Sequence, residues 1–344
     1  MEMREMIAAL ASQRAPAGFE RGAHQTAAEL LRPFVDDLET DVLGNLIGKR
    51  RCGVEGAPVV MLDAHLDEVG LIVTGYEGAF LRFDSIGGVD ERILPAAEVV
   101  LLAPEGPIRG VIDALPPHVV PESEREKPVP MEKLFIDAGF SDGEQAAERV
   151  PRGTPAVYAT PCFAMGEHLL AGKSLDDRSC AAILIAAMQK LHGKTLAADV
   201  AVHLAAQEEV GGRGALTGAW GVDPDYALAV DVTFGTAPGT PADRSCRLGG
   251  GTAIGLGPAA ARTVSDKLIA VAEKRGIPYQ LEVMGGRSGT DADEIQTTRG
   301  GVATGLVSLP LRYMHTPTEI IDLRDAEAAA ELIAAWIESF GEED

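Results

Sequence analysis

Short, almost entirely apolar segments alternate with helix-forming segments in both outer parts of this 344-residue sequence. Apolar runs of a few residues are typical of strands buried on both faces, whereas apolar residues spaced three and four apart indicate helices. This alternation predicts an α/β fold with a mixed, mostly parallel sheet and helices on both faces. The expected strands are 41–49, one within 58–70, 199–206, 227–232 and 302–309, and the expected helices are 4–13, 19–36, 175–191, 265–275 and 325–340.

The middle of the sequence has a different texture. Short alternating segments there are separated by Gly and Pro turns, and the only helical pattern of useful length lies near Asp142–Glu148. Such spacing is typical of a small β-rich module. We therefore predict an α/β domain in two parts, 1–70 and 161–344, interrupted by an inserted β-rich domain at 71–160.

Composition and charge narrow the function classes. The formal net charge of -22 repels phosphate backbones, so nucleic acid and anionic membranes are not expected partners. No apolar run approaches the roughly 20 residues of a membrane span, and the charged start Met1–Glu5 does not resemble a secretion signal. We expect a cytoplasmic protein whose four separated cysteines form neither a disulfide framework nor a zinc ribbon.

Polar clusters stand where apolar strands end or where a helix begins. In open α/β sheets the carboxyl ends of the strands meet at one crevice, so residues far apart in the sequence can converge there. The Gly-rich loop Gly285–Asp291 is also expected beside this crevice. The clusters are His65 with Asp67, Asp176 with Asp177, Glu208 with Glu209, Asp231, and His315.

Each cluster has a simpler explanation when it is taken alone. A histidine with an acidic neighbour is often structural, and paired glutamates can end a strand in solvent. Asp176 or Asp177 can cap the following helix, and Asp231 can do the same or occupy a turn. Cys180 is read as a small buried residue, and a lone His315 in a loop is more often structural.

Taken together, the clusters indicate a metal site. In an extended chain Asp67 lies on the same side as His65 and can accept its imidazole N–H, which leaves the other nitrogen free for a metal. Of Glu208 and Glu209, one can bind metal while the other acts as a base, and burying both without a cation would be costly. Histidines and carboxylates without thiolates suit Zn, Co or Mn, and two ions sharing one carboxylate can activate water.

Five motifs together resemble the glutamyl aminopeptidase and tetrahedral aminopeptidase family of dinuclear metallopeptidases. The resemblance covers nearly the whole chain, in the order and approximate spacing of that family. The motifs are Asp63-Ala-His-Leu-Asp-Glu-Val-Gly70, Gly172-Lys-Ser-Leu-Asp-Asp-Arg178, Gln207-Glu-Glu-Val-Gly-Gly-Arg-Gly214, Val230-Asp-Val-Thr233 and Arg312-Tyr-Met-His-Thr-Pro-Thr-Glu319.

The resemblance implies two divalent ions per subunit, Zn or Co first and Mn as a third choice. It implies that Asp176 bridges the ions, that His65 and Asp231 hold one ion, and that Glu209 and His315 hold the other. The bridge is placed on Asp176 rather than Asp177 by this resemblance alone.

The resemblance also implies an activity, which is the removal of N-terminal residues from small peptides by a metal-bridged water. Glu208 is then the general base and Asp67 orients His65. The implied fold is of the zinc-exopeptidase type with an inserted PDZ-like domain that supports homo-oligomers, commonly dodecamers.

Other function classes fit parts of this sequence pattern. A metal-dependent deacylase or other amidohydrolase on N-acyl substrates would use the same metals but would not bind a free α-amine. A non-catalytic scaffold protein with this fold would be expected to lack a ligand or the base, and none is missing from the motifs.

Overall fold

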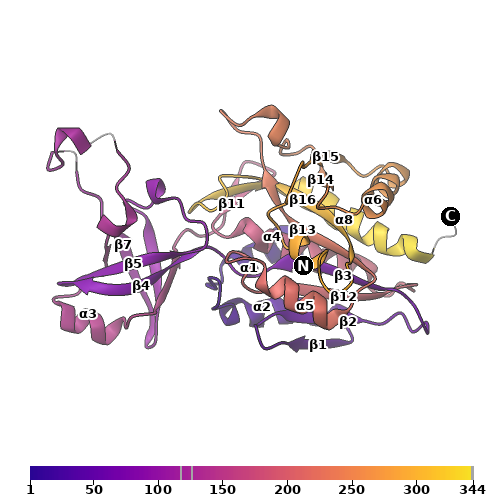
Figure 1. The fold of residues 1–344 in the computed structure, drawn as a ribbon, viewed down its shortest axis with the longest axis horizontal. Helices are drawn as coiled ribbons and strands as arrows, with labels where there is room; N and C mark the ends of the chain where they lie inside the picture. Colours follow the sequence, from indigo (N-terminus) through magenta and orange to yellow (C-terminus); the bar gives the residue numbers. More distant parts are fainter. Residues whose placement is uncertain (117, 125–126, 342–344) are drawn as a thin grey trace.

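The chain folds into an α/β body with a small barrel beside it. The structure is a computed structural model that describes residues 1–116, 118–124 and 127–341. Figure 1 shows the barrel, formed by the middle of the chain, standing apart at the left, while both outer parts of the chain build the body at the right. Among the described residues, no helix has both the length and the apolar character that crossing a membrane requires.

Four parallel strands form the centre of the eleven-stranded sheet, in the order β12-β3-β13-β16. The apolar runs of the sequence become these strands because they are buried on both faces, as parallel strands usually are. Their carboxyl ends share one edge of the sheet. The bounds are β3 Val59–His65, β12 Asp199–Ala205, β13 Tyr226–Phe234 and β16 Ala303–Arg312.

Antiparallel strands extend the sheet on both sides, which confirms a mixed sheet. The single strand predicted at 41–49 is wrong, because the side chain of Asp41 accepts the backbone N–H groups of Leu43, Gly44 and Asn45 and closes a turn. The marginal strands are β1 Asp37–Thr40, β2 Leu46–Arg50, β10 Phe163–Met165, β11 Leu169–Gly172, β14 Thr252–Leu256, β15 Tyr279–Val283 and β17 Glu319–Asp322.

Helices cover both faces of the sheet. The larger core lies on one face and contains alternate residues of β3 such as Leu62 together with apolar residues of α1, α4, α6 and α8, while Met61 belongs to the smaller core under α5 and α7. α4 is buried on almost every side, which explains its continuous Ala, Ile and Leu sequence. The helices are α1 Met3–Ala11, α2 Arg21–Leu31, α4 Leu175–Leu191, α5 Arg213–Val222, α6 Arg262–Arg275, α7 Ala292–Ile295 and α8 Leu323–Glu338.

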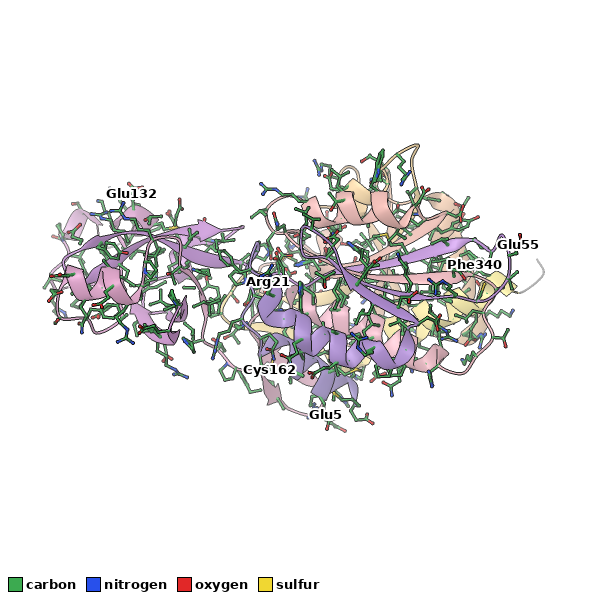
Figure 2. The ribbon with its side chains drawn as sticks, turned by 90° about the horizontal axis from the view of Figure 1, so that it is seen from below. Glu5, Arg21, Glu55, Glu132, Cys162 and Phe340 are labelled. Carbon is green, nitrogen blue, oxygen red and sulfur yellow. The ribbon has the colours of Figure 1, made fainter. Side chains whose placement is uncertain are left out.

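The barrel closes in the order β4-β5-β8-β7-β6-β9, with β9 pairing back onto β4. It has its own apolar core, separate from the two cores of the body. Figure 2 shows Glu132 on the barrel, at the opposite end of the molecule from Glu55 and Phe340. The PDZ-like character of the barrel and the predicted domain boundaries stay predictions. The bounds are β4 Gly70–Glu77, β5 Phe80–Ile86, β6 Glu98–Ala103, β7 Gly106–Ile112, β8 Ile136–Asp137, β9 Pro155–Tyr158 and α3 Gly143–Arg149.

α5 lies unusually close to the sheet. His203 of β12 pairs in register with Asp63 of β3, and its Nδ1 lies 2.5 Å from an Asp63 carboxylate oxygen. The imidazole is fully buried beneath Gly218, where a methyl group would lie 1.9 Å from His203 Nε2. The absence of a side chain at this position therefore sets how closely α5 packs.

We expect Gly218→Ala to destabilise the protein by at least ~1–3 kcal/mol, because the added methyl group overpacks a rigid core. Gly221→Ala in the same helix is the matched control, since a Cβ there meets nothing within 4 Å. The free energy of unfolding of Gly221→Ala should rise by up to ~1 kcal/mol, because Ala has a higher helix propensity than Gly. Urea unfolding with an unchanged m-value measures both effects, and equal midpoints for the two variants would refute this account.

Candidate metal centre

The predicted site residues converge at the carboxyl edge of the parallel strands. His65 ends β3, Asp231 lies in β13, and Asp176 is the second residue of α4. The paired glutamates follow β12, and His315 follows β16. Three groups of potential ligands result, each with its ligand atoms within 4.8 Å of one another: His65 with Asp177 and Asp231, His65 with Glu208 and Glu209, and Asp176 with Glu209 and His315.

The carboxylate of Asp176 lies between the two imidazoles. Its Oδ1 is 3.2 Å from His65 Nε2, and its Oδ2 is 3.4 Å from His315 Nε2. His315 Nε2 is also 3.3 Å from an oxygen of Glu209. A carboxylate that turns one oxygen toward each of two histidines has the arrangement that a bridging ligand needs.

Asp177 lies closer to this centre than the sequence indicated. Its Oδ2 accepts the backbone N–H of His65 at 3.1 Å, and its Oδ1 is buried without a hydrogen-bond partner among the described residues. The group containing Asp231 therefore includes Asp177 rather than Asp176. From the sequence, either aspartate of the pair can cap the helix while the other bridges two ions, and only the family resemblance favours Asp176 as the bridge.

Asp67 mainly anchors the two glutamates. Its two carboxylate oxygens accept the backbone N–H groups of Glu208 and Glu209, each at 3.1 Å. The ring Nδ1 of His65 lies 3.1 Å from the backbone oxygen of Asp67 and 3.4 Å from its carboxylate. The imidazole therefore meets both the main chain of Asp67 and the carboxylate to which the sequence pointed.

Glu319 is a second anchoring carboxylate, and sequence reasoning missed it. It is buried, and its oxygens accept the backbone N–H of Asp176 at 3.0 Å and that of His315 at 2.8 Å. Its only sequence signal is that it ends the motif containing His315.

Asp291, from the Gly-rich loop expected beside the site, is also buried and interacts electrostatically with Glu208.

Opposite charges make the imidazoles strongly basic. Burial alone would lower the pKa of both histidines. Contacts with Asp176 and Asp67 nevertheless raise the pKa of His65 well above its usual value. Contacts with Asp176 and Glu209 likewise raise the pKa of His315 to about 11. Burial opposes ionisation of Asp176, yet the two histidines hold the pKa of that carboxyl below its usual value.

The remaining carboxyl groups of the centre have too little positive charge near them to offset the effect of burial. Burial raises the pKa of Glu208 to about 9 and that of Asp231 to about 7. Burial also raises the pKa of Glu209, and burial with the nearby Asp231 raises that of Asp177. This crowding of buried carboxyl groups is what a divalent cation would relieve.

The donor set fits divalent metal ions. Imidazole nitrogens and carboxylate oxygens suit Zn, Co or Mn, and no cysteine belongs to the three groups of potential ligands. Oε1 of Glu209 and Oδ1 of Asp177 are buried and lack hydrogen-bond partners among the described residues, although buried carboxylate oxygens are normally paired.

Comparison with known proteins identifies close relatives. The M42 glutamyl aminopeptidase family model matches residues 44–332. A lysyl aminopeptidase of Pyrococcus furiosus is 34% identical over 93% of this chain and 92% of that protein. The aminopeptidase APDkam598 from the archaeon Desulfurococcus kamchatkensis has a TM-score of 0.91 and 39% identity over 98% of this chain and 94% of that one. The Pyrococcus horikoshii TET1 peptidase, described as assembling into a tetrahedron or a large octahedral shell, has a TM-score of 0.86 and 32% identity over 98% and 99%.

We expect metal binding to release protons and to strengthen as the pH rises. The raised pKa values of His65 and His315 keep both rings protonated in the metal-free protein, and a metal requires the neutral ring. Affinity should therefore fall on acidification, by about tenfold per pH unit for each proton displaced. Zn titration calorimetry in two buffers of different ionisation enthalpy measures the release, and a flat affinity between about pH 6 and 8 would contradict it.

Proposed function

Since the chain belongs to the M42 glutamyl aminopeptidase family and is therefore a peptide-bond hydrolase, we propose that it removes N-terminal residues from small peptides with two divalent ions. The observation that carries this proposal is the position of the Asp176 carboxylate between the imidazoles of His65 and His315.

Each ion would have its own ligands beside the shared Asp176. His65 and Asp231, which form a group of potential ligands with Asp177, would hold one ion, and Asp176 would reach it beside His65. Glu209 and His315, which form a group with Asp176, would hold the other ion. When bound, such ions supply Lewis acidity toward a peptide carbonyl and a water molecule. Zn, Co and Mn all suit these ligands.

Glu208 would move the proton from water to the leaving amine. Its side chain is 16% exposed against 4% for Glu209, so Glu208 is open to a substrate while Glu209 faces its histidine partner. Asp67 holds the backbone N–H groups of both residues and so fixes where each carboxylate can reach. Burial raises the pKa of Glu208 to about 9 in the metal-free chain, and two bound cations would lower it toward the working pH, where the carboxylate can accept a proton.

The barrel would mediate assembly of a homo-oligomer, for which a dodecamer is the expected size. The TET1 relative that assembles into closed shells supports this proposal. Large apolar side chains are also exposed on the barrel, among them Leu115 at 68% and Val119 at 65%. In this proposal residues 71–160 form the assembly domain, and residues 1–70 and 161–344 form the catalytic domain.

Glu208→Gln should lower kcat by roughly 10²- to 10⁴-fold, because the base is lost while the ligands remain. Glu209→Gln is the matched neighbour and should instead weaken metal binding. Turnover of an aminoacyl p-nitroanilide and bound metal by elemental analysis separate the two effects.

Two outcomes would count against this mechanism. One is near-wild-type turnover by Glu208→Gln, and the other is activity that persists in fully metal-free protein. The N-acetylated form of the same anilide is the substrate control, since an aminopeptidase requires the free α-amine. Preferential cleavage of the acetylated form would instead indicate a deacylase.

Light scattering should give a particle mass that is a multiple of the chain mass, with twelve chains expected. Leu115→Asp should shift the particle toward smaller species, because a charge would replace an apolar contact. Val42→Asp is the control, since Val42 is fully exposed on the body. A wild-type monomer, or equal effects of both substitutions, would exclude this role for the barrel.

A further inference from the structure

Arg178 is completely buried directly after the Asp176–Asp177 pair, and its side chain reaches two other segments of the chain. Its Nε donates to the backbone oxygen of Leu66 at 3.0 Å. Its Nη1 donates to the backbone oxygen of Gln13 at 2.6 Å, and its Nη2 donates to that of Ala15 at 3.2 Å. Arg178 therefore joins the start of α4, the end of β3 and the segment that follows α1.

Glu68 and Lys173 complete a buried charged cluster with Arg178. One Glu68 oxygen accepts from Arg178 at 2.9 Å and from the backbone N–H of Ala15 at 3.0 Å, and the other accepts from Lys173 at 2.7 Å. Lys173 also donates to the backbone oxygen of Gln13 at 2.8 Å. Two cations share one carboxylate, and the surplus positive charge faces backbone carbonyl oxygens just beyond the C-terminal end of α1, where the helix dipole is negative.

The cluster flanks the candidate metal ligands without touching them. Leu66, which binds Arg178, lies between His65 and Asp67 in the sequence. Lys173 and Arg178 stand on either side of Asp176. The cluster thus fixes the distance between the end of β3 and the start of α4, which is the distance that brings His65 to Asp176.

A second contact runs from the same N-terminal segment to the predicted base. Glu20 is 4% exposed, and its Oε1 accepts the backbone N–H of Gly18 at 2.6 Å and of Gln207 at 3.1 Å. Gln207 has a φ of 60° and directly precedes Glu208. Glu20 therefore supports the turn from which Glu208 projects.

We propose that the N-terminal segment Leu10–Glu20 is a positioning element of the metal centre, acting through the cluster Glu68, Lys173 and Arg178 and through Glu20. The inference rests on the proposed dinuclear function, because it assigns the segment the task of holding metal ligands and base in register. A protein is often equally stable when apolar residues of similar volume replace a buried ion cluster, so stability alone does not account for these three buried charges. What the guanidinium offers is a rigid fork of directed N–H donors, which an apolar residue cannot replace.

Arg178→Lys tests the cluster, because it keeps the charge and removes the fork. We expect metal affinity to fall about 10- to 100-fold, as for loss of groups that support metal ligands. Titration calorimetry without substrate gives this affinity. Hydrogen exchange of the metal-free protein should show faster exchange at residues 65–68. Glu68→Gln should weaken metal binding in the same direction.

Asp325→Asn is the matched control. Asp325 is equally buried and accepts the backbone N–H groups of Gly249 and Gly251, a loop without candidate ligands. We expect it to lower the urea midpoint while leaving metal affinity unchanged. If Arg178→Lys lowers the midpoint as much as this control and binds metal like wild type, the cluster is merely structural and the inference is overturned.

Glu20→Ala supplies an independent arm if the cluster variants do not fold. It should lower kcat about 10- to 100-fold with KM and metal affinity little changed, because it frees the turn before Glu208. Unchanged kcat would overturn the inference. Failure of the proposed function is recognised separately, since wild-type protein would then bind no pair of ions or would keep its activity without them.

Discussion

The candidate metal centre depends on the electrostatic cost of placing several carboxylates close together in a buried site. Burial raises the pKa of Glu208, Glu209 and Asp231, while Asp176 stays acidic because an imidazole lies at each of its oxygens. Such a cluster is stable only when positive charge compensates it. Protons on the two histidines supply that charge in the metal-free chain, and divalent ions would supply it in the working enzyme.

One kind of contact positions the residues of the candidate metal centre at two places. Asp67 uses its two oxygens to hold the backbone N–H groups of Glu208 and Glu209, and Glu319 does the same for Asp176 and His315. A carboxylate with two acceptor oxygens can fix two main-chain segments at once. The side chains that reach the centre are thereby set by the backbone, which leaves their own carboxylates and rings free for chemistry.

The parallel strands and the N-terminal segment contribute to the site in different ways. Parallel pairing of β3, β12, β13 and β16 brings the strand ends to one edge but leaves the loops beyond them free in direction. The buried contacts of Glu68, Lys173, Arg178 and Glu20 would fix those directions. The barrel has a core of its own, and the loop after β5 reaches back to the candidate metal centre, where the backbone oxygen of Gly88 lies 2.9 Å from Nδ1 of His315.

The sequence determined the elements whose patterns are local and strong. It predicted the buried helix Leu175–Leu191, the central strands, the β-rich middle and the polar strand ends, because periodicity and apolar runs record burial directly. It did not reveal the turn at Asp41, which a single side chain closes locally within an expected strand. It also did not reveal α5 or the anchoring of Asp176 by Glu319, since these depend on contacts between segments far apart in the sequence. The tertiary structure alone decided that Asp176 lies between both histidines while Asp177 turns to the backbone of His65, because adjacent aspartates look alike until their neighbours are in place.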